Sequence, residues 1–147
     1  MSDNNVIVFP TDFSDLSLQA LPMAKRMAAV MDAELHCVYT VEEPHIYATL
    51  DMGPVPIPTA EELAESARIR LQNFVKEHVS GLDKPVVAKV LIGNPAEEIV
   101  RYAEEVHAAM IVMTTHGYSG VKHLLLGSTT EGVLRHAKCP VLSVRVS

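Results

Sequence analysis

Short apolar runs rich in β-branched residues recur five times along the chain, and a helical pattern lies between each run and the next. These runs cover residues 5–10, 33–41, 86–92, 108–114 and 141–146. Apolar residues repeat at three- and four-residue steps, as in amphipathic helices, over residues 15–31, 59–80, 95–107 and 128–137. Short buried strands that alternate with helices are typical of an α/β protein. They predict a single-layer parallel sheet with helices on both faces.

Length and charge narrow the classes of function. The chain has 147 residues, which predicts one domain over 1–147. Its formal net charge is −6, so a nucleic acid is not expected as a partner. The polar start and the lack of an apolar run of about 20 residues predict a cytoplasmic protein without membrane insertion. Cys37 and Cys139 have no metal-ligand spacing and are interpreted as small buried side chains.

Local signals mark the ends of the helices. Ser14 is a natural N-cap, and Thr59 with Glu62 forms a capping box. Pro22 lies inside the first helical pattern and is expected to kink that helix or delay its start. Residues 42–58 are rich in proline and predict a long loop, either a lid or a partner surface.

The stretch 113–130 carries the chemistry. Gly117 and Gly120 permit a positive φ and a close approach of the backbone to a ligand. Gly127 is followed by three hydroxyl residues at a predicted helix N-terminus, where a phosphate is a natural guest. The alternative is an ordinary glycine turn with Ser128 as the N-cap. The stretch is neither a Walker A loop nor the GxGxxG pattern of dinucleotide enzymes.

The spacing Gly117, nine residues, Gly127-Ser128 resembles the nucleotide signature of the universal stress protein family. Further resemblances are Val6–Ser14, the Leu35–Val38 strand, the Gly93–Ile99 turn and Lys138–Leu142. The family implies a Rossmann-like sheet with strand order 3-2-1-4-5. Thr114 departs from the signature, since it stands where the first glycine belongs. Its side chain either crowds the ribose or hydrogen-bonds to it.

The resemblance implies a site for ATP or AMP, with Mg²⁺ carried by the nucleotide. Asp12 would lie near the ribose and the nucleotide-bound metal, Cys37 and Val38 would frame the adenine through backbone groups, and the 127–129 turn would hold the phosphates. The expected nucleotide-binding residues are Pro10, Thr11, Asp12, Cys37, Val38, Met113, Thr114, His116, Gly117, Gly127, Ser128, Thr129 and Thr130.

The last strand is expected to pair antiparallel with its copy in a homodimer, as the family does, through Val141, Leu142, Ser143, Val144, Arg145 and Val146. An alternating edge strand is a template for such pairing. The alternative is a monomer in which the charge of Arg145 prevents the edge strand from pairing with another chain.

Three functions stay open at this point. The first is a regulatory module of the stress response, whose nucleotide state or dimer is read by a partner. The second is a slow ATP hydrolase or phosphotransferase, and the third a dimeric interaction protein with a vestigial pocket. A flavin domain is a weaker alternative, because residues 10–14 contain no glycine. No catalytic triad or poised general base is recognisable, so an enzyme is not the expected class.

Overall fold

The computed structural model describes residues 5–43, 57–115 and 127–146. Its centre is a five-stranded sheet in the order β3-β2-β1-β4-β5, and every pairing is parallel. The strands are β1 (Val6–Pro10), β2 (Glu34–Val41), β3 (Val86–Ile92), β4 (Met110–Thr114) and β5 (Val141–Val144). The predicted fold and strand order are therefore confirmed.

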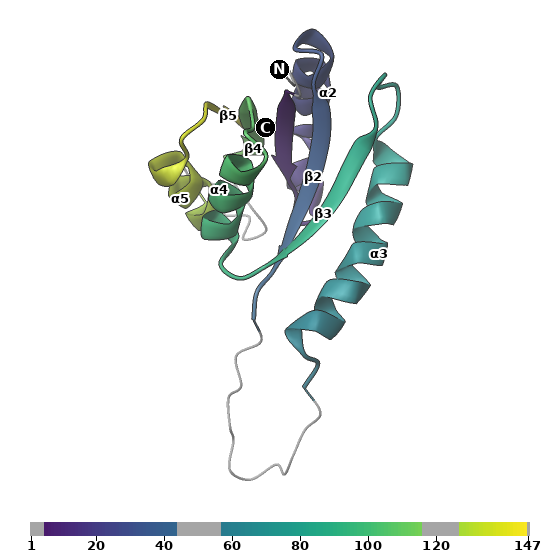
Figure 1. The fold of residues 1–147 in the computed structure, drawn as a ribbon, viewed down its shortest axis with the longest axis vertical. Coiled ribbons are helices and arrows are strands. Elements are labelled where there is room, and N and C mark those ends of the chain that lie inside the picture. Colours follow the sequence, from purple (N-terminus) through teal and green to yellow (C-terminus); the bar gives the residue numbers. More distant parts are fainter. Residues whose placement is uncertain (1–4, 44–56, 116–126, 147) are drawn as a thin grey trace.

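Helices cover both faces of this sheet (Figure 1). One face carries α2 (Leu21–Val30), which follows the single turn α1 (Asp15–Leu18), and also α3 (Ala60–His78). The other carries α4 (Pro95–Glu105) and α5 (Ser128–His136), which pack against each other. The sheet thus separates α3 from α5, and both helices begin at the edge where the strands end.

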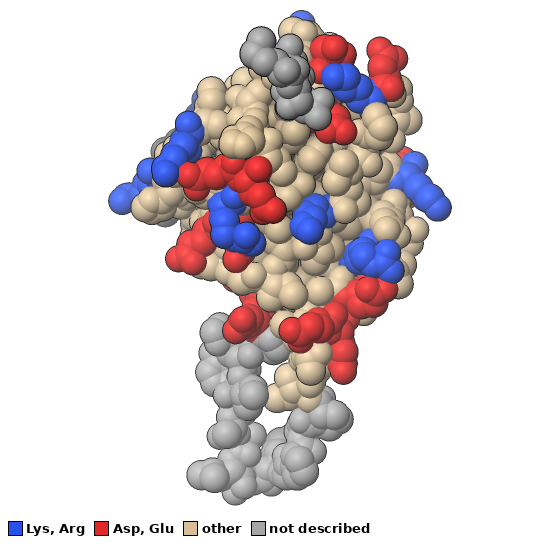
Figure 2. Space-filling view, in the orientation of Figure 1, with Lys and Arg blue, Asp and Glu red and all other residues tan. Residues whose placement is uncertain are grey.

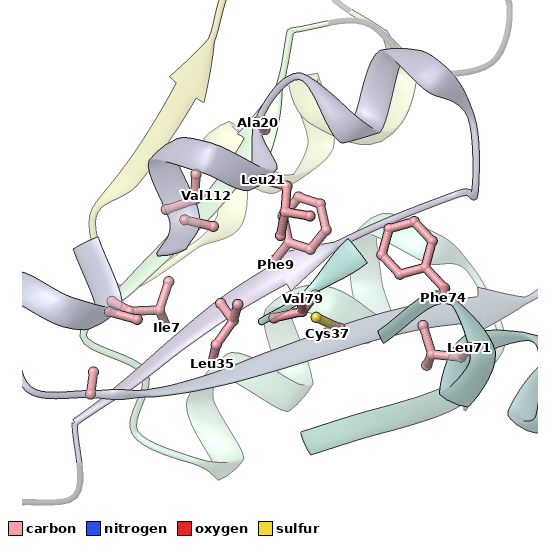
Figure 3. Close-up of a cluster of buried hydrophobic side chains, with 13 residues drawn as sticks. Ile7, Phe9, Ala20, Leu21, Leu35, Cys37, Leu71, Phe74, Val79 and Val112 are labelled. Atoms are coloured by element: carbon pink, nitrogen blue, oxygen red, sulfur yellow. The ribbon is translucent and has the colours of Figure 1, made fainter. Parts of the chain in front are cut away.

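Two apolar clusters fill the spaces between the helices and the sheet. Figure 3 shows the cluster on the α2 and α3 side, where Phe9, Leu35 and Leu71 are fully buried. The cluster on the other side includes Val38, Ile99 and Val133. Alternate residues of β1 and β2 enter opposite clusters, as the two-residue period of a strand requires. Because both faces are covered, β1 is apolar throughout, and β2 is apolar over most of its buried part.

The first helical pattern divides into two helices, where the sequence predicted one over 15–31. The break lies at Gln19 and Ala20, and α2 begins at Leu21 with Pro22 in its first turn. Proline is tolerated in that position because the first helical N–H groups have no partner within the helix. The expectation of a delayed helix start is confirmed, and that of one continuous helix is wrong.

The predicted N-cap hydrogen bonds of Ser14 and Thr59 are present. Ser14 Oγ accepts from Ser17 N at 3.1 Å, and Thr59 Oγ1 accepts from Glu62 N at 3.1 Å. Ser128 is not an N-cap, because it is the first helical residue and Gly127 occupies the cap position. Within the described residues, no helix combines the length and apolar character needed to cross a membrane.

Candidate functional site

A cavity of about 610 Å³ lies at the carboxyl edge of the sheet. Its wall contains the ends of β1, β2 and β4, the start of α4 and the first turn of α5. The volume falls in the range of about 300–1,000 Å³ that is usual for small-molecule sites. The predicted site residues that line it are Pro10, Thr11, Asp12, Val38, Met113, Thr114, Gly127, Ser128, Thr129 and Thr130.

The first turn of α5 is fixed against the end of β4. Thr130 Oγ1 donates to the carbonyl oxygen of Thr114 at 2.8 Å, and Thr130 is 3% exposed. Gly127 N donates to the carbonyl oxygen of Thr115 at 2.9 Å. Among the described residues, no side chain caps the N-terminus of α5, whereas Ser14, Thr59 and Asn94 cap other helices. The first N–H groups of α5 therefore remain for an anion in the cavity.

Asp12 belongs to a tight polar turn after β1. Its Oδ1 accepts from Ser14 N at 2.9 Å and also from the Ser14 hydroxyl. Its Oδ2 has no hydrogen-bond partner among the described residues. One carboxylate oxygen of Asp12 therefore holds the turn, and the other is available on the cavity wall.

Thr11 stabilises the same turn through its side chain. Its hydroxyl forms a hydrogen bond with Ser17 Oγ at 2.8 Å and accepts from Phe13 N at 3.0 Å. Phe13 follows with a φ of 67°, a left-handed conformation that is uncommon for a bulky side chain. The turn after β1 is therefore a constrained structure that fixes Asp12 at the cavity.

The end of β2 supplies Val38, Tyr39 and Thr40 to the cavity wall. Cys37 does not line it, because this residue is fully buried in the cluster that faces α2 and α3. Burial raises the pKa of the Cys37 thiol to about 12. The backbone carbonyl of Val38 accepts from Thr11 N at 2.9 Å, which ties β2 to the turn after β1.

Sequence reasoning missed several residues of the wall. They are Ser17, Tyr39, Thr40, Glu42, Arg70, Pro95 and Ile99. Arg70 is the most informative, because its helix begins about twenty residues after β2 and no sequence motif connects it to the site. Arg70 is exposed on α3, and its sequence neighbours do not indicate a binding role. His116 and Gly117 lie outside the described residues.

The donor set fits a phosphorylated ligand. The described part of the chain contains no group of three or more His, Cys, Asp or Glu side chains that could hold a metal by themselves. Mg²⁺ is usually bound through one or two carboxylates together with substrate phosphates. The free Oδ2 of Asp12 could supply such a ligand, and Mg²⁺ would then add charge stabilisation at the phosphates.

An α/β domain with a ligand-sized cavity at its strand ends belongs to the class of open-sheet binding domains. Residues 4–145 match the universal stress protein family, and the chain belongs to that family. Universal stress protein MJ0531 of Methanocaldococcus jannaschii is 37% identical over 139 residues, covering 95% of this chain and 81% of the relative. Universal stress protein YxiE of Bacillus subtilis is 30% identical over 148 residues, covering 96% and 99%.

Solved structures share the fold. Protein MJ0577 of the same archaeon aligns with a TM-score of 0.77 and 30% identity, covering 97% of this chain and 96% of the other. A universal stress protein in complex with cAMP aligns with a TM-score of 0.66 and 25% identity, covering 98% of each chain.

Proposed function

We propose that this protein binds an adenine nucleotide, ATP or AMP, and acts as a regulatory module whose nucleotide state is read by a partner. The observation that carries the proposal is the uncapped N-terminus of α5, which opens into the cavity beside Asp12. The solved relative in complex with cAMP supports the choice of an adenine nucleotide.

Each part of the wall would have its own task. The first N–H groups of α5 and the hydroxyls of Ser128 and Thr129 would bind phosphate oxygens. Backbone groups at the end of β2, around Val38, would contact the base. Asp12 would contact the ribose or the nucleotide-bound Mg²⁺ through its free oxygen. Thr114 is buried at 7% exposure, so its side chain is already accommodated in the wall.

Fast hydrolysis is not expected of this site. The carboxylates on the described wall are Asp12 and Glu42, and one oxygen of Asp12 is engaged in the turn. Neither is placed by its neighbours as a general base in the way a catalytic triad places its histidine. We expect turnover below about 1 s⁻¹, the low end of ordinary enzymes.

Binding is tested by thermal unfolding of the nucleotide-free protein with ATP and Mg²⁺. A ligand at about 100 times its Kd adds about 2.7 kcal/mol to the free energy of unfolding. For a domain of this size the expected rise in Tm is roughly 5–10 °C. Gly127→Val, which places a branched side chain at the phosphate position, should abolish the rise. A vestigial pocket would be favoured if ATP left the Tm of the natural chain unchanged but raised the Tm of a Thr114→Gly variant.

We also propose a homodimer that pairs through β5. The carbonyl of Pro140, just before β5, accepts from Ile111 N of β4, and the carbonyl of Val144 accepts from Thr115 N, just after β4. Because hydrogen-bonding directions alternate along a parallel edge strand, the backbone groups of Ser143 point away from β4. Ser143→Pro removes one outward donor and spares the ladder with β4, so it should convert a dimer to a monomer in sedimentation. Ser143→Ala is the control, and a Ser143→Pro variant that stays dimeric would contradict pairing through this strand.

A further inference from the structure

The charges around the cavity are unfavourable for an anionic ligand. Two carboxylates, Asp12 and Glu42, line it, and the protein carries a formal net charge of −6. Figure 2 shows Asp and Glu side chains gathered at the lower end of this face, where β2 leaves the sheet and α3 begins in Figure 1. A nucleotide that enters the cavity is therefore repelled unless a positive group lies inside.

Arg70 is the one cationic side chain among the described residues of the cavity wall. Within the described ranges it has no ion pair, whereas Arg68, two residues earlier on α3, is paired with Glu65. The guanidinium of Arg70 is thus not neutralised by a neighbouring carboxylate.

Aromatic packing holds this guanidinium in place. Its Cζ lies 4.3 Å from the centroid of the Phe13 ring. Phe13 in turn packs against Tyr39, with ring centroids 4.5 Å apart, and against Phe74, with centroids 5.9 Å apart. A cation over an aromatic face keeps the N–H groups at its edge available for other acceptors.

The ring that lies under Arg70 belongs to Phe13, whose φ of 67° is left-handed. Such a backbone conformation is unfavourable for a bulky residue and persists only where the surrounding structure enforces it. Here the enforcing contacts are the Thr11 hydroxyl below the turn and the rings of Tyr39 and Phe74. The same turn therefore presents Asp12 to the cavity and supports Arg70 at its rim.

We propose that Arg70 binds the phosphate of the nucleotide and selects ligands with a free phosphate over uncharged nucleosides. The inference rests on the proposed function and deepens it. Arg70 comes from α3 on one face of the sheet, and the α5 N-terminus comes from the other. The phosphates would lie across the strand ends between the guanidinium and the helix N-terminus, where planar N–H pairs match phosphate oxygens.

Calorimetric titrations of the full chain with ATP, AMP, adenosine and inorganic tripolyphosphate test this role. Arg70→Gln should weaken binding of ATP by about tenfold to a hundredfold, the usual effect of losing a hydrogen bond between charged groups. Adenosine affinity should change by less than about twofold, within the usual spread for a surface substitution. Arg70→Lys retains the charge and should recover part of the loss.

Arg68→Gln is the matched control, because it removes a guanidinium from the same helix at a position that does not line the cavity. Unchanged ATP affinity in Arg70→Gln, or an equal loss for adenosine, would overturn the role of Arg70 while leaving nucleotide binding intact. A natural chain that binds neither nucleotide nor tripolyphosphate would remove the proposed function and this inference together.

Discussion

Gly132 of α5 lies directly against Ala96 of α4. A Cβ atom added to Gly132 would lie 2.6 Å from the Cβ of Ala96, a distance that carbon atoms do not sustain. The first turns of these two helices both line the cavity, through Pro95 and through residues 127–130. The missing side chain at Gly132 therefore lets the two helices approach each other and positions the turn that we propose binds phosphate.

Gly132→Ala should move α5 outward. Overpacking costs typically about 1–3 kcal/mol, and the better helix propensity of alanine returns about 1 kcal/mol. We expect a net loss of stability in chemical denaturation and weaker nucleotide binding. Adding Ala96→Gly transfers the methyl group from α4 to α5, so the double variant should recover both properties. Equal defects in the single and double variants would mean that this contact does not position the turn.

Thr130→Val tests the link between α5 and β4. Valine has nearly the shape of threonine but cannot donate to the carbonyl of Thr114. Loss of this buried hydrogen bond should lower the free energy of unfolding by about 1–3 kcal/mol. Thr130→Ser keeps the hydroxyl and is the control. The prediction is wrong if valine and serine variants unfold at the same denaturant concentration.

The pattern of strands and helices was predictable because each buried strand is a local run of apolar and β-branched residues. Caps such as Thr59 were predictable because their hydrogen bonds join residues three apart. The approach of Arg70 to Phe13 was not, since it depends on how α3 packs across the sheet. The contact of Gly132 with Ala96 also depends on tertiary packing. In the sequence alone, a glycine within a helix indicates only a residue of low helix propensity.

We expect His36 to make the stability of the protein sensitive to mild acid. Its Nδ1 forms a hydrogen bond with the Tyr102 hydroxyl at 2.7 Å, while its Nε2 lies 3.6 Å from a carboxylate oxygen of Glu34 and has no hydrogen bond among the described residues. Burial lowers the pKa of His36, and the nearby charge of Glu34 opposes this shift without overcoming it.

A histidine held neutral in the fold binds its proton more readily when the chain is unfolded. Its contribution to stability is therefore complete above the ordinary pKa of about 6.5 and is lost as the pH falls through its lower folded value. Denaturant titrations below pH 6.5 should show a steeper loss of stability for the natural chain than for His36→Gln. Identical slopes for the two proteins would show that His36 is not the group responsible.

The thiols should differ in reactivity. Cys37 is fully buried and its pKa is raised to about 12, so at pH 8 only about one thiol in ten thousand is ionised. Cys139 is half-buried, and burial raises its pKa as well. A disulfide reagent should therefore modify Cys139 slowly in the native protein and reach Cys37 only after unfolding. Rapid reaction of two thiols per folded chain would contradict this burial.

Asp12→Asn separates the two tasks of the turn after β1. Asparagine retains an oxygen that can accept from Ser14 N, so the turn and the stability should change little. It removes the negative charge that a nucleotide-bound Mg²⁺ would contact. We expect the enhancement of ATP binding by Mg²⁺ to disappear, while AMP binding without metal is preserved. Titrations with ATP in the presence of Mg²⁺ or of a chelator provide the measurement. A variant that retains the full Mg²⁺ effect would show that Asp12 serves the turn alone.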